Sequence, residues 1–553
     1  MASLLPAIGL MLLTPWVVLG TNALHSSNFR GPSVQLGHAT VFGTRNGSVE
    51  SFVGIPYAEP PIGDLRLRLP RLIDSYHESF NATTYGHPCL QLSANSLGDF
   101  PPDVQQDLEP LLAAASASAN HAHLRSLPRS GLYINIVRPK NVPVDAKLPV
   151  LFWIYGGSFT DGSNALLGYN GTAIVQRSIE LNKPVIYVAL NYRLHVFGFL
   201  GGKEVKDAGV SNLGLHDQRA ALRWVHKFIR PFGGDPSKVT VWGESAGAFS
   251  TFLHLYTNHG NTEGLFRGAI MSSGASVPTE DISEVQGTYD FVVDQVGCAN
   301  ATNTLACLRK APTESLLAAA KTAPSDNTPF LPRVDGSFIT IPPMHLPSKG
   351  KIADVPIIIG DVKDEGTLFA FSGLNSTADD DEFTNYVSRF LLPGATPADL
   401  NILLDLYPSD PAAGSPFDTG DAVTFSPQYK RLAAVFGDWF FNGPRRLFLE
   451  HVSAKRTTYN FLSARSSFPG IGYFHASDLE NAFGPGDMTD YFIRFVHNLD
   501  PNGRSGVQWP KYNTSARLTL QFNDGSVPLN VTVDDQRKAG IQEVTRLALR
   551  FPL

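Results

Sequence analysis

Apolar runs about the length of a β-strand recur along the chain, and each ends at a turn residue or a polar group. The clearest runs are Leu148–Ile154, Pro184–Asn191, Val239–Trp242, Gly268–Met271 and Val355–Ile359. A continuous apolar run, unlike an alternating one, is typical of a strand that is buried on both faces of a parallel sheet. The pattern therefore predicts a large, mostly parallel sheet flanked by helices.

Helical patterns lie between these runs. In residues 217–230, apolar side chains recur at helical spacing, at Ala220, Ala221, Trp224, Val225 and Phe228. The segment Pro231-Phe232-Gly233-Gly234 follows, and such residues end helices. The alternation of strands and helices predicts an α/β fold with a doubly wound sheet. In such sheets the functional groups gather at the carboxyl ends of the strands.

The segment Gly243-Glu244-Ser245-Ala246-Gly247 is the strongest functional signal. It fits the pattern Gly-x-Ser-x-Gly and lies between a predicted strand, Lys238–Trp242, and a helix-compatible segment, Ala246–Tyr256. This strand–turn–helix setting is that of a nucleophile elbow. The two glycines leave room for a tight turn, and the helix directs its positive N-terminal end at the reacting centre. We predict that Ser245 is a nucleophile; the alternative is a structural turn in which the serine stands by chance.

Several longer segments resemble the type-B carboxylesterase/lipase family, which includes the cholinesterases. Besides the elbow, they are Gly54–Pro61, Asn191–Arg193, Phe197–Leu200, Asn212–Gln218 and Phe232–Pro236. The similarity runs from about residue 34 to near the C-terminus, and the segments around Cys89 and Ile134–Pro139 are most similar to secreted fungal lipases and sterol esterases. The resemblance implies an α/β-hydrolase fold and the hydrolysis of carboxylic esters.

A serine hydroxyl needs a histidine as base, and the histidine needs a carboxylate to orient it. In α/β-hydrolases the acid precedes the histidine along the chain. The resemblance assigns the base to His475, whereas His451 and His497 lie in no matching context. It assigns the acid to Glu365, and the neighbouring Asp364 is the alternative.

The glycine-rich segment Trp153–Phe159 follows a predicted strand and resembles the Gly-Gly-Gly-Phe loop of the family. The resemblance implies an oxyanion hole made by the backbone amides of Gly157, Ser158 and Ala246. Ser158 stands where the family has its third glycine, and we expect its side chain to crowd the acyl or alcohol pocket. The alternative, a phosphate-binding loop, lacks the lysine and the spacing that such loops require.

The chain has three cysteines. Cys298 and Cys307 match a disulfide of the family in spacing and context. Cys89 is left over, because Gly131 occupies the position of its expected partner, and we expect a buried free thiol. The family's acidic partner for Arg66 is also missing, since Arg129-Ser130 stand in its place.

Residues from about 89 to 131 form an insertion that resembles the lid of the family's lipases. Its apolar residues recur at helical spacing: Val104, Leu108, Leu111, Leu112 and Ala115. An amphipathic lid would present apolar surface to lipid; the alternative is a helix packed on the core. Without the usual disulfide, we expect a lid that is less restrained at one end and is cut first by proteases between Ser93 and Arg129.

The N-terminal segment and the glycosylation sequons predict the cellular location. Leu4–Gly20 is almost wholly apolar and is followed by Thr21-Asn22-Ala23, which predicts a secretory signal peptide over residues 1–23; a membrane anchor is the alternative. We expect residues 24–553 to form a single domain. Seven Asn-x-Ser/Thr sequons suit an exported glycoprotein: Asn46, Asn81, Asn170, Asn300, Asn375, Asn513 and Asn530. The net charge of -6 without clustered Lys or Arg indicates no nucleic-acid partner.

Together these features predict a secreted serine ester hydrolase that works through an acyl-enzyme on Ser245 without a metal or cofactor. Its substrate is a small-molecule or lipid ester, such as a glyceride or sterol ester, met in solution or at a lipid–water interface. Two alternatives stay open: an esterase limited to short or aromatic acyl groups, and a non-catalytic binding or adhesion module on the same fold. We expect a monomer or a weak dimer.

Overall fold

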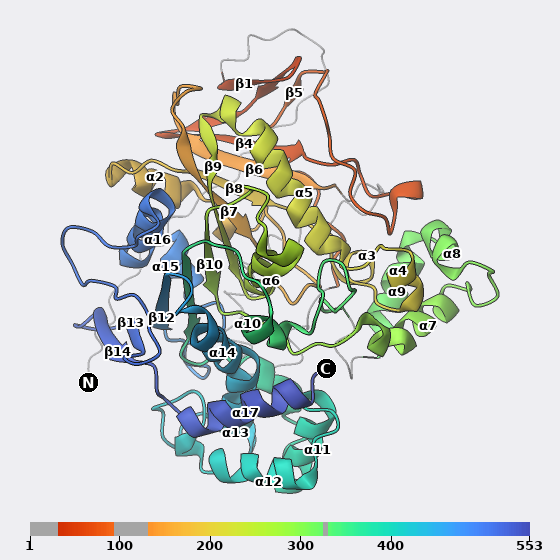
Figure 1. Ribbon diagram of the computed structural model, residues 1–553, viewed down its shortest axis with the longest axis vertical. Coiled ribbons are helices and arrows are strands. Elements are labelled where there is room, and N and C mark those ends of the chain that lie inside the picture. Colours follow the sequence, from red (N-terminus) through yellow and green to blue (C-terminus); the bar gives the residue numbers. More distant parts are fainter. Residues whose placement is uncertain (1–30, 93–130, 325–329) are drawn as a thin grey trace, which may run out of the picture.

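The computed structural model describes residues 31–92, 131–324 and 330–553. Within these ranges, eleven strands form one large sheet in the order β14-β13-β12-β11-β10-β9-β7-β8-β6-β4-β3, and three form a small sheet in the order β1-β2-β5 (Figure 1). The strands are β1 Ser33–Leu36, β2 Ala39–Phe42, β3 Thr44–Asn46, β4 Val49–Pro56, β5 Phe80–Asn81, β6 Tyr133–Pro139, β7 Leu148–Ile154, β8 Ile186–Leu190, β9 Gly234–Glu244, β10 Gly268–Ser272, β11 Ile357–Val362, β12 Thr458–Ala464, β13 Leu518–Asn523 and β14 Leu529–Val533.

The centre of the large sheet is parallel. Strand β7 pairs in parallel with β8 and β9, and parallel pairing continues from β9 through β10, β11 and β12 to β13. The pairs β13–β14, β8–β6, β6–β4 and β4–β3 are antiparallel. This topology confirms the predicted mostly parallel sheet. All five apolar runs lie on its parallel strands, which are buried on both faces.

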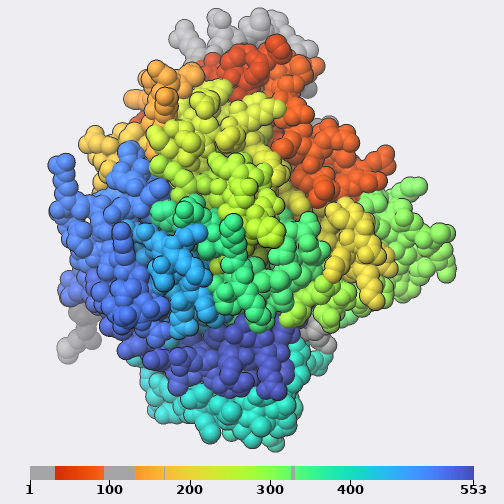
Figure 2. All heavy atoms as spheres, in the orientation of Figure 1, coloured from red at the N-terminus to blue at the C-terminus, as the bar shows by residue number. Residues whose placement is uncertain are grey.

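Among the described residues, helices lie on both faces of this sheet and beyond its ends (Figure 1). They are α2 Thr172–Glu180, α3 His195–Gly198, α4 Lys203–Asp207, α5 Leu213–Phe228, α6 Ala246–Gly260, α7 Gln286–Gln295, α8 Thr304–Lys310, α9 Thr313–Thr322, α10 Leu346–Lys349, α11 Asp380–Phe390, α12 Pro397–Leu406, α13 Tyr429–Gly437, α14 Gly443–Val452, α15 Leu479–Phe483, α16 Asp487–Asn498 and α17 Lys538–Arg550. In Figure 1, α2 and α16 lie across the sheet from α5 and α6. Helices α11 and α12 gather at one end of the molecule, and Figure 2 shows this segment in teal as the lower surface.

Aromatic side chains bind one helical layer to the sheet. The ring of Trp242 on β9 lies 4.4 Å from that of Trp153 on the neighbouring β7, between ring centroids. On its outer side the Trp242 ring lies 4.7 Å from Phe483 of α15 and 5.5 Å from Phe492 of α16. These large buried rings contribute much of the apolar area removed from water. They fix the strand that leads directly to Ser245.

Two predicted helices are present with adjusted ends. The helix expected over 217–230 is α5, which begins four residues earlier, at Leu213, because the αL residue Asn212 precedes it. The helix expected over Ala246–Tyr256 is α6, whose regular part ends at Tyr256, because the next residues leave the helical conformation.

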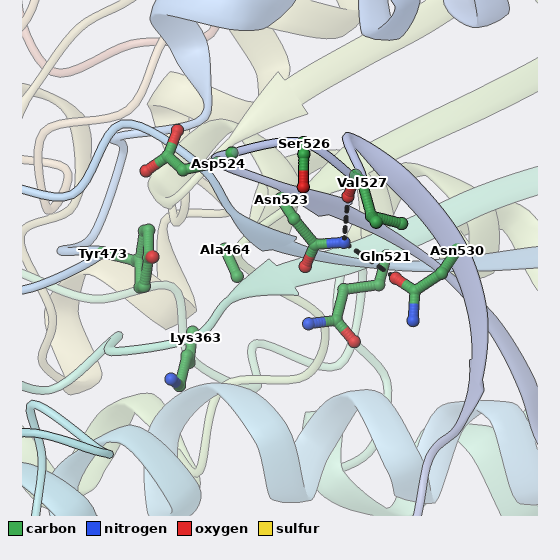
Figure 3. A pocket seen from close by; sticks show the side chains of 10 residues that line it. Lys363, Ala464, Tyr473, Gln521, Asn523, Asp524, Ser526, Val527 and Asn530 are labelled. Atoms are coloured by element: carbon green, nitrogen blue, oxygen red, sulfur yellow. Dashed lines mark hydrogen bonds between the residues drawn. The ribbon is translucent and has the colours of Figure 1, made fainter.

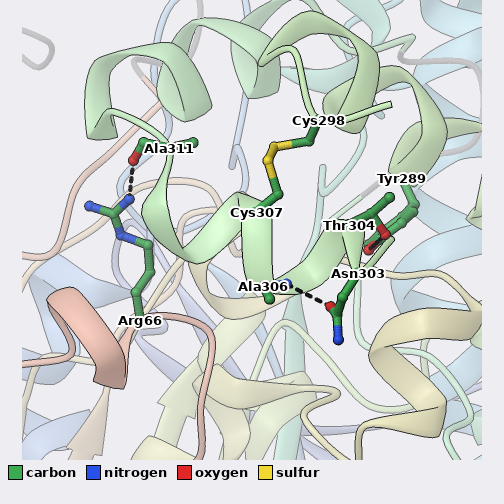
Figure 4. The surroundings of a disulfide bond; sticks show 8 residues. All are labelled: Arg66, Tyr289, Cys298, Asn303, Thr304, Ala306, Cys307 and Ala311. Carbon is green, nitrogen blue, oxygen red and sulfur yellow. Dashed lines mark hydrogen bonds between the residues drawn. A yellow bond between two sulfur atoms is a disulfide. The ribbon is translucent and has the colours of Figure 1, made fainter. Parts of the chain in front are cut away.

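The disulfide between Cys298 and Cys307 is present, with a sulfur–sulfur distance of 2.02 Å (Figure 4). It closes the loop before α8, where Asn303 caps the helix by accepting a hydrogen bond from the Ala306 amide at 2.8 Å. Arg66 reaches the same region: its guanidinium donates to the carbonyl of Ala311 and, at 2.6 Å, to the hydroxyl of Thr313. Arg66 thus has partners other than the family's acidic residue, whose position lies outside the described residues.

Cys89 is a buried free thiol, as expected, and burial raises the pKa of this thiol. A Cβ atom at Gly131 would lie 1.7 Å from the ring of Tyr133, and one at Gly86 would lie 2.3 Å from it. The ring of Tyr133 thus fills the space that a cysteine at position 131 would need. The expected signal peptide and lid residues 93–130 lie outside the described residues, and among those described no helix is long and apolar enough to cross a bilayer.

Candidate active site

Ser245 stands in the tight turn between β9 and α6. Its φ of 53° and ψ of -124° are strained for a residue with a side chain, and such strain is concentrated at functional sites. The turn depends on its two glycines. A Cβ at Gly243 would lie 2.1 Å from the carbonyl oxygen of Gly247, and a Cβ at Gly247 would lie 1.9 Å from that of Ile154. The sequence therefore forms the predicted elbow at the carboxyl end of a central strand.

The loops after two other parallel strands bring Glu365 and His475 together. Glu365 follows β11 and His475 follows β12. The Glu365 Oε2 atom lies 2.6 Å from His475 Nδ1, while its Oε1 atom accepts a hydrogen bond from the Val362 amide at 2.8 Å. Both side chains are buried. The carboxylate thus holds the imidazole with Nδ1 as donor, which directs Nε2 away from Glu365.

The Nε2 atom of His475 faces the elbow. It lies 3.4 Å from Oε1 of Glu244, the residue before Ser245, and makes no hydrogen bond with any described residue. A base without its substrate commonly has such loose contacts, which tighten when the reacting group arrives. The structure therefore gathers Ser245, Glu365 and His475 at one edge of the sheet, and their catalytic roles stay a prediction.

Asp364, the alternative acid, has a different set of partners. Its carboxylate accepts hydrogen bonds from the Ser415 hydroxyl at 2.9 Å, the Phe417 amide at 2.8 Å and the Tyr473 amide at 3.0 Å. These bonds attach the loop after β11 to the loop that carries His475. Asp364 thus fixes the two loops relative to each other, while Glu365 is the carboxylate that contacts the imidazole.

The predicted oxyanion loop presses against the elbow. A Cβ at Gly156 would lie 2.8 Å from Cβ of Ser245, and a Cβ at Gly157 would lie 2.2 Å from Oδ1 of Asp161. Gly157 and Ser158 have φ values of 99° and 53°, a left-handed conformation that glycine adopts most easily. The Ser158 side chain is exposed. The amides of Gly157, Ser158 and Ala246 donate to no acceptor among the described residues, which leaves them available to a developing oxyanion.

Two further carboxyl groups lie near the imidazole, and neither is predicted from the sequence. Glu244 and Asp478 are fully buried; Glu244 Oε1 and both Asp478 oxygens have no hydrogen-bond partner in the described structure. Burial raises the pKa of Glu244 to about 8 and that of Asp478 to about 7. Glu244 stands in the elbow motif, but the sequence gives no sign that it approaches His475, whereas Asp478 lies only three residues after His475 in the same segment.

The pKa of His475 reflects opposing influences. Burial, the largest, lowers it, but the charge and hydrogen bond of Glu365, followed by the charges of Glu244 and Asp478, outweigh burial and raise the pKa to about 9. Each proton that Glu244 or Asp478 binds removes one negative charge from the site. The pKa of His475 therefore depends on the protonation of Glu244 and Asp478, and Glu365 makes the direct contact that favours the protonated imidazole.

Aromatic rings form one wall beside His475. The ring of Phe441 lies 4.7 Å from the imidazole and that of Phe369 lies 5.2 Å from it, between centroids. Phe369 also stacks on Phe436 at 4.8 Å, and both of these rings are half-buried. Phe441 belongs to a short π-helix, Asp438–Asn442, a rare element that is frequent at functional sites. The wall offers apolar surface next to the reacting groups.

The mostly parallel sheet, the helices that flank it and the elbow between β9 and α6 define the class of proteins with an α/β-hydrolase fold. The crystal structure of EstA from Aspergillus niger is similar, with a TM-score of 0.78 and 27% identity, and the match covers 95% of this chain and 100% of that chain. The sequence model of the carboxylesterase family matches residues 30–540. The chain belongs to the carboxylesterase family.

Curated relatives agree with this assignment. Lipase 4 of Diutina rugosa is 41% identical to this chain over 89% of it and 91% of the relative. Secreted lipase 1 of Botryotinia fuckeliana is 40% identical over 87% of each chain. These similarities support carboxylic ester hydrolase activity.

Proposed function

We propose that the protein is a secreted carboxylic ester hydrolase in which Ser245 is the nucleophile, His475 the general base and acid, and Glu365 the orienting carboxylate. The observation that carries the proposal is the 2.6 Å contact between Glu365 Oε2 and His475 Nδ1, made beside a strained serine elbow. Ser245 follows β9, Glu365 follows β11 and His475 follows β12. All three strands belong to the parallel part of the sheet, and α/β folds place their reacting groups at the carboxyl ends of such strands.

The reaction proceeds in two steps. Ser245 Oγ attacks the ester carbonyl while His475 Nε2 takes the hydroxyl proton; the alcohol then leaves with that proton, and the acyl group stays on Ser245. Water, activated by His475, attacks the acyl-enzyme and releases the carboxylic acid. Glu365 stabilises the imidazolium that forms in each step. The amides of Gly157, Ser158 and Ala246 receive the negative charge of the tetrahedral intermediates.

The apolar wall beside His475 favours an ester with a hydrocarbon acyl group. The half-buried rings of Phe369 and Phe436 give such a chain a surface on which to leave water. We propose lipid esters, glycerides or sterol esters, as the substrate class, in keeping with the names of the relatives. Short or aromatic acyl groups are the second candidate, because Ser158 replaces a glycine in the oxyanion loop.

A rate series on p-nitrophenyl esters from acetate to palmitate tests the proposal. Ser245→Ala is compared with wild type and with Ser237→Ala, a control that removes an exposed hydroxyl from the same strand. We expect long-chain esters to be cleaved best, the control to be fully active and Ser245→Ala to be inactive. Cleavage of short-chain esters alone would be consistent with Ser245 as the nucleophile but would reject lipid esters as the substrate class. Full activity in Ser245→Ala would reject the catalytic assignment.

A further inference from the structure

A polar pocket lies at one edge of the large sheet, apart from the candidate active site. Its volume is about 530 Å³, within the range of small-ligand pockets. Side chains from β13 and β14, from the turn between them and from the loops after β11 and β12 line it, and they include Gln521, Asn523, Ser526, Asn530 and Tyr473 (Figure 3). Neither Ser245 nor its two proposed partners is among them. An ester held at Ser245 would therefore not fill this pocket.

One lining residue belongs to a glycosylation sequon, Asn530-Val531-Thr532. The side-chain Nδ2 atom of Asn523 donates to the backbone carbonyl of Val527 at 3.2 Å and to Asn530 Oδ1 at 2.8 Å. Because Asn523 offers its NH₂ group to both acceptors, Asn530 presents its carbonyl oxygen to Asn523. Its Nδ2 atom points away from that bond (Figure 3). The Asn530 side chain is exposed. Its Nδ2 atom, to which a glycan would be attached, is therefore accessible for modification.

The strand that carries Asn530 is an edge strand. Among the described residues, β14 pairs with β13 alone, so its other side presents unpaired backbone groups. Three valines on and beside it, Val527, Val531 and Val533, are 60%, 40% and 42% exposed. An exposed apolar edge strand is a template for pairing with another chain, and proteins cover or interrupt such edges.

We propose that Asn530 carries an N-linked glycan whose first sugar occupies this pocket and whose outer sugars shield β14 from a second copy of the chain. The inference rests on the secretion proposed above. Asn530 Nδ2 forms a bond to the anomeric carbon of a lipid-linked diphospho-oligosaccharide. The bond from that carbon to the diphosphate breaks, the lipid diphosphate leaves with the electron pair, and Nδ2 loses a proton. Oδ1 is not consumed, so the hydrogen bond from Asn523 survives.

The pocket suits a sugar in chemical terms. Gln521 and Ser526 offer an amide and a hydroxyl to sugar hydroxyl groups, and the Tyr473 ring and Val527 offer apolar surface to the sugar's C–H groups. All seven sequon asparagines are exposed, but Asn530 is the one that lines this pocket.

The test uses the full chain secreted from a eukaryotic host, with glycopeptide mass spectrometry. Thr532→Val removes the sequon hydroxyl and keeps the side-chain shape, Thr532→Ser keeps the sequon, and Asn300→Gln removes a distant sequon. We expect wild type and Thr532→Ser to carry a glycan on Asn530 and Thr532→Val to lose that mass. In size-exclusion chromatography, Thr532→Val shifts to larger species, whereas Thr532→Ser and Asn300→Gln elute with wild type. Hydrolysis by monomeric fractions is unchanged in all variants.

A second measurement on folded wild type guards against misfolding of a variant. An endoglycosidase that leaves one sugar on each asparagine keeps the pocket filled, and we expect the trimmed protein to retain protection of Asn523 and Gln521 amides in hydrogen exchange. An empty Asn530 in the secreted protein overturns the inference, and so does an unchanged elution of Thr532→Val. If the chain is retained in the cells and does not reach the medium, the proposed secretion fails as well, whereas ester hydrolysis is scored separately.

Discussion

Replacing Glu365 by Gln removes one negative charge from the imidazole and keeps the side-chain shape. The pKa of His475 is raised from 6.5 to about 9, so the site favours the protonated imidazole by about 3 kcal/mol, at about 1.36 kcal/mol per pKa unit. Burial opposes this, and Glu365 makes the largest favourable contribution. Loss of its charge therefore lowers kcat/KM by about 10²-fold, and by about 10⁴-fold if the amide also stabilises the wrong tautomer.

The assay is the pH dependence of kcat/KM on p-nitrophenyl butyrate. The acidic limb reports protonation of the base in the free enzyme. A negative neighbour raises the pKa of a histidine, so its removal moves this limb to lower pH. Glu180→Gln, on the surface, is the matched control and should equal wild type. A Glu365→Gln enzyme with the wild-type rate and an unmoved acidic limb would refute the reasoning.

Three further changes test other parts of the site and its support. Glu244→Gln keeps kcat/KM within about fivefold of wild type at pH 7, because the raised pKa leaves this carboxyl mostly neutral there; a pH–rate profile that differs only above pH 8 is expected, and a large loss at pH 7 would contradict it. Gly157→Ala lowers kcat by about 10²–10³-fold in single-turnover assays, because the new methyl group would collide with Asp161 and displace the loop. An unchanged rate would show that the amides of this loop do not stabilise the oxyanion. Arg445→Met leaves the buried carboxylates of Asp361 and Asp534 without their shared partner. It should lower the free energy of unfolding, measured in urea, by about 3–5 kcal/mol. A loss below about 1 kcal/mol would show that these ion pairs contribute little to stability.

The centre of the fold follows directly from sequence, because its strands are buried on both faces. Leu148–Ile154 has the same ends in the sequence pattern and in β7. The antiparallel edges carry a weaker signal. In β14 most side chains are exposed, so no continuous apolar run marks the strand, and its existence depends on pairing with β13.

The same distinction applies to the site. The elbow is local, so five consecutive residues predict it, and the glycine contacts explain why the residue types are required. The contact of Glu365 with His475 joins residues 110 positions apart, and a resemblance was needed to select them. The approach of Glu244 to the imidazole depends on how the elbow packs against the loop that carries His475, which a single sequence does not encode in any short pattern.

The most direct test of the central claim is covalent labelling of the nucleophile. The enzyme is treated with a fluorophosphonate ester, which reacts with activated serines, and the labelled peptide is identified by mass spectrometry. The account predicts one adduct per chain, on Ser245, formed by wild type and Ser237→Ala and absent from Ser245→Ala. An adduct on another residue, or hydrolysis that persists when Ser245 is fully labelled, would contradict it.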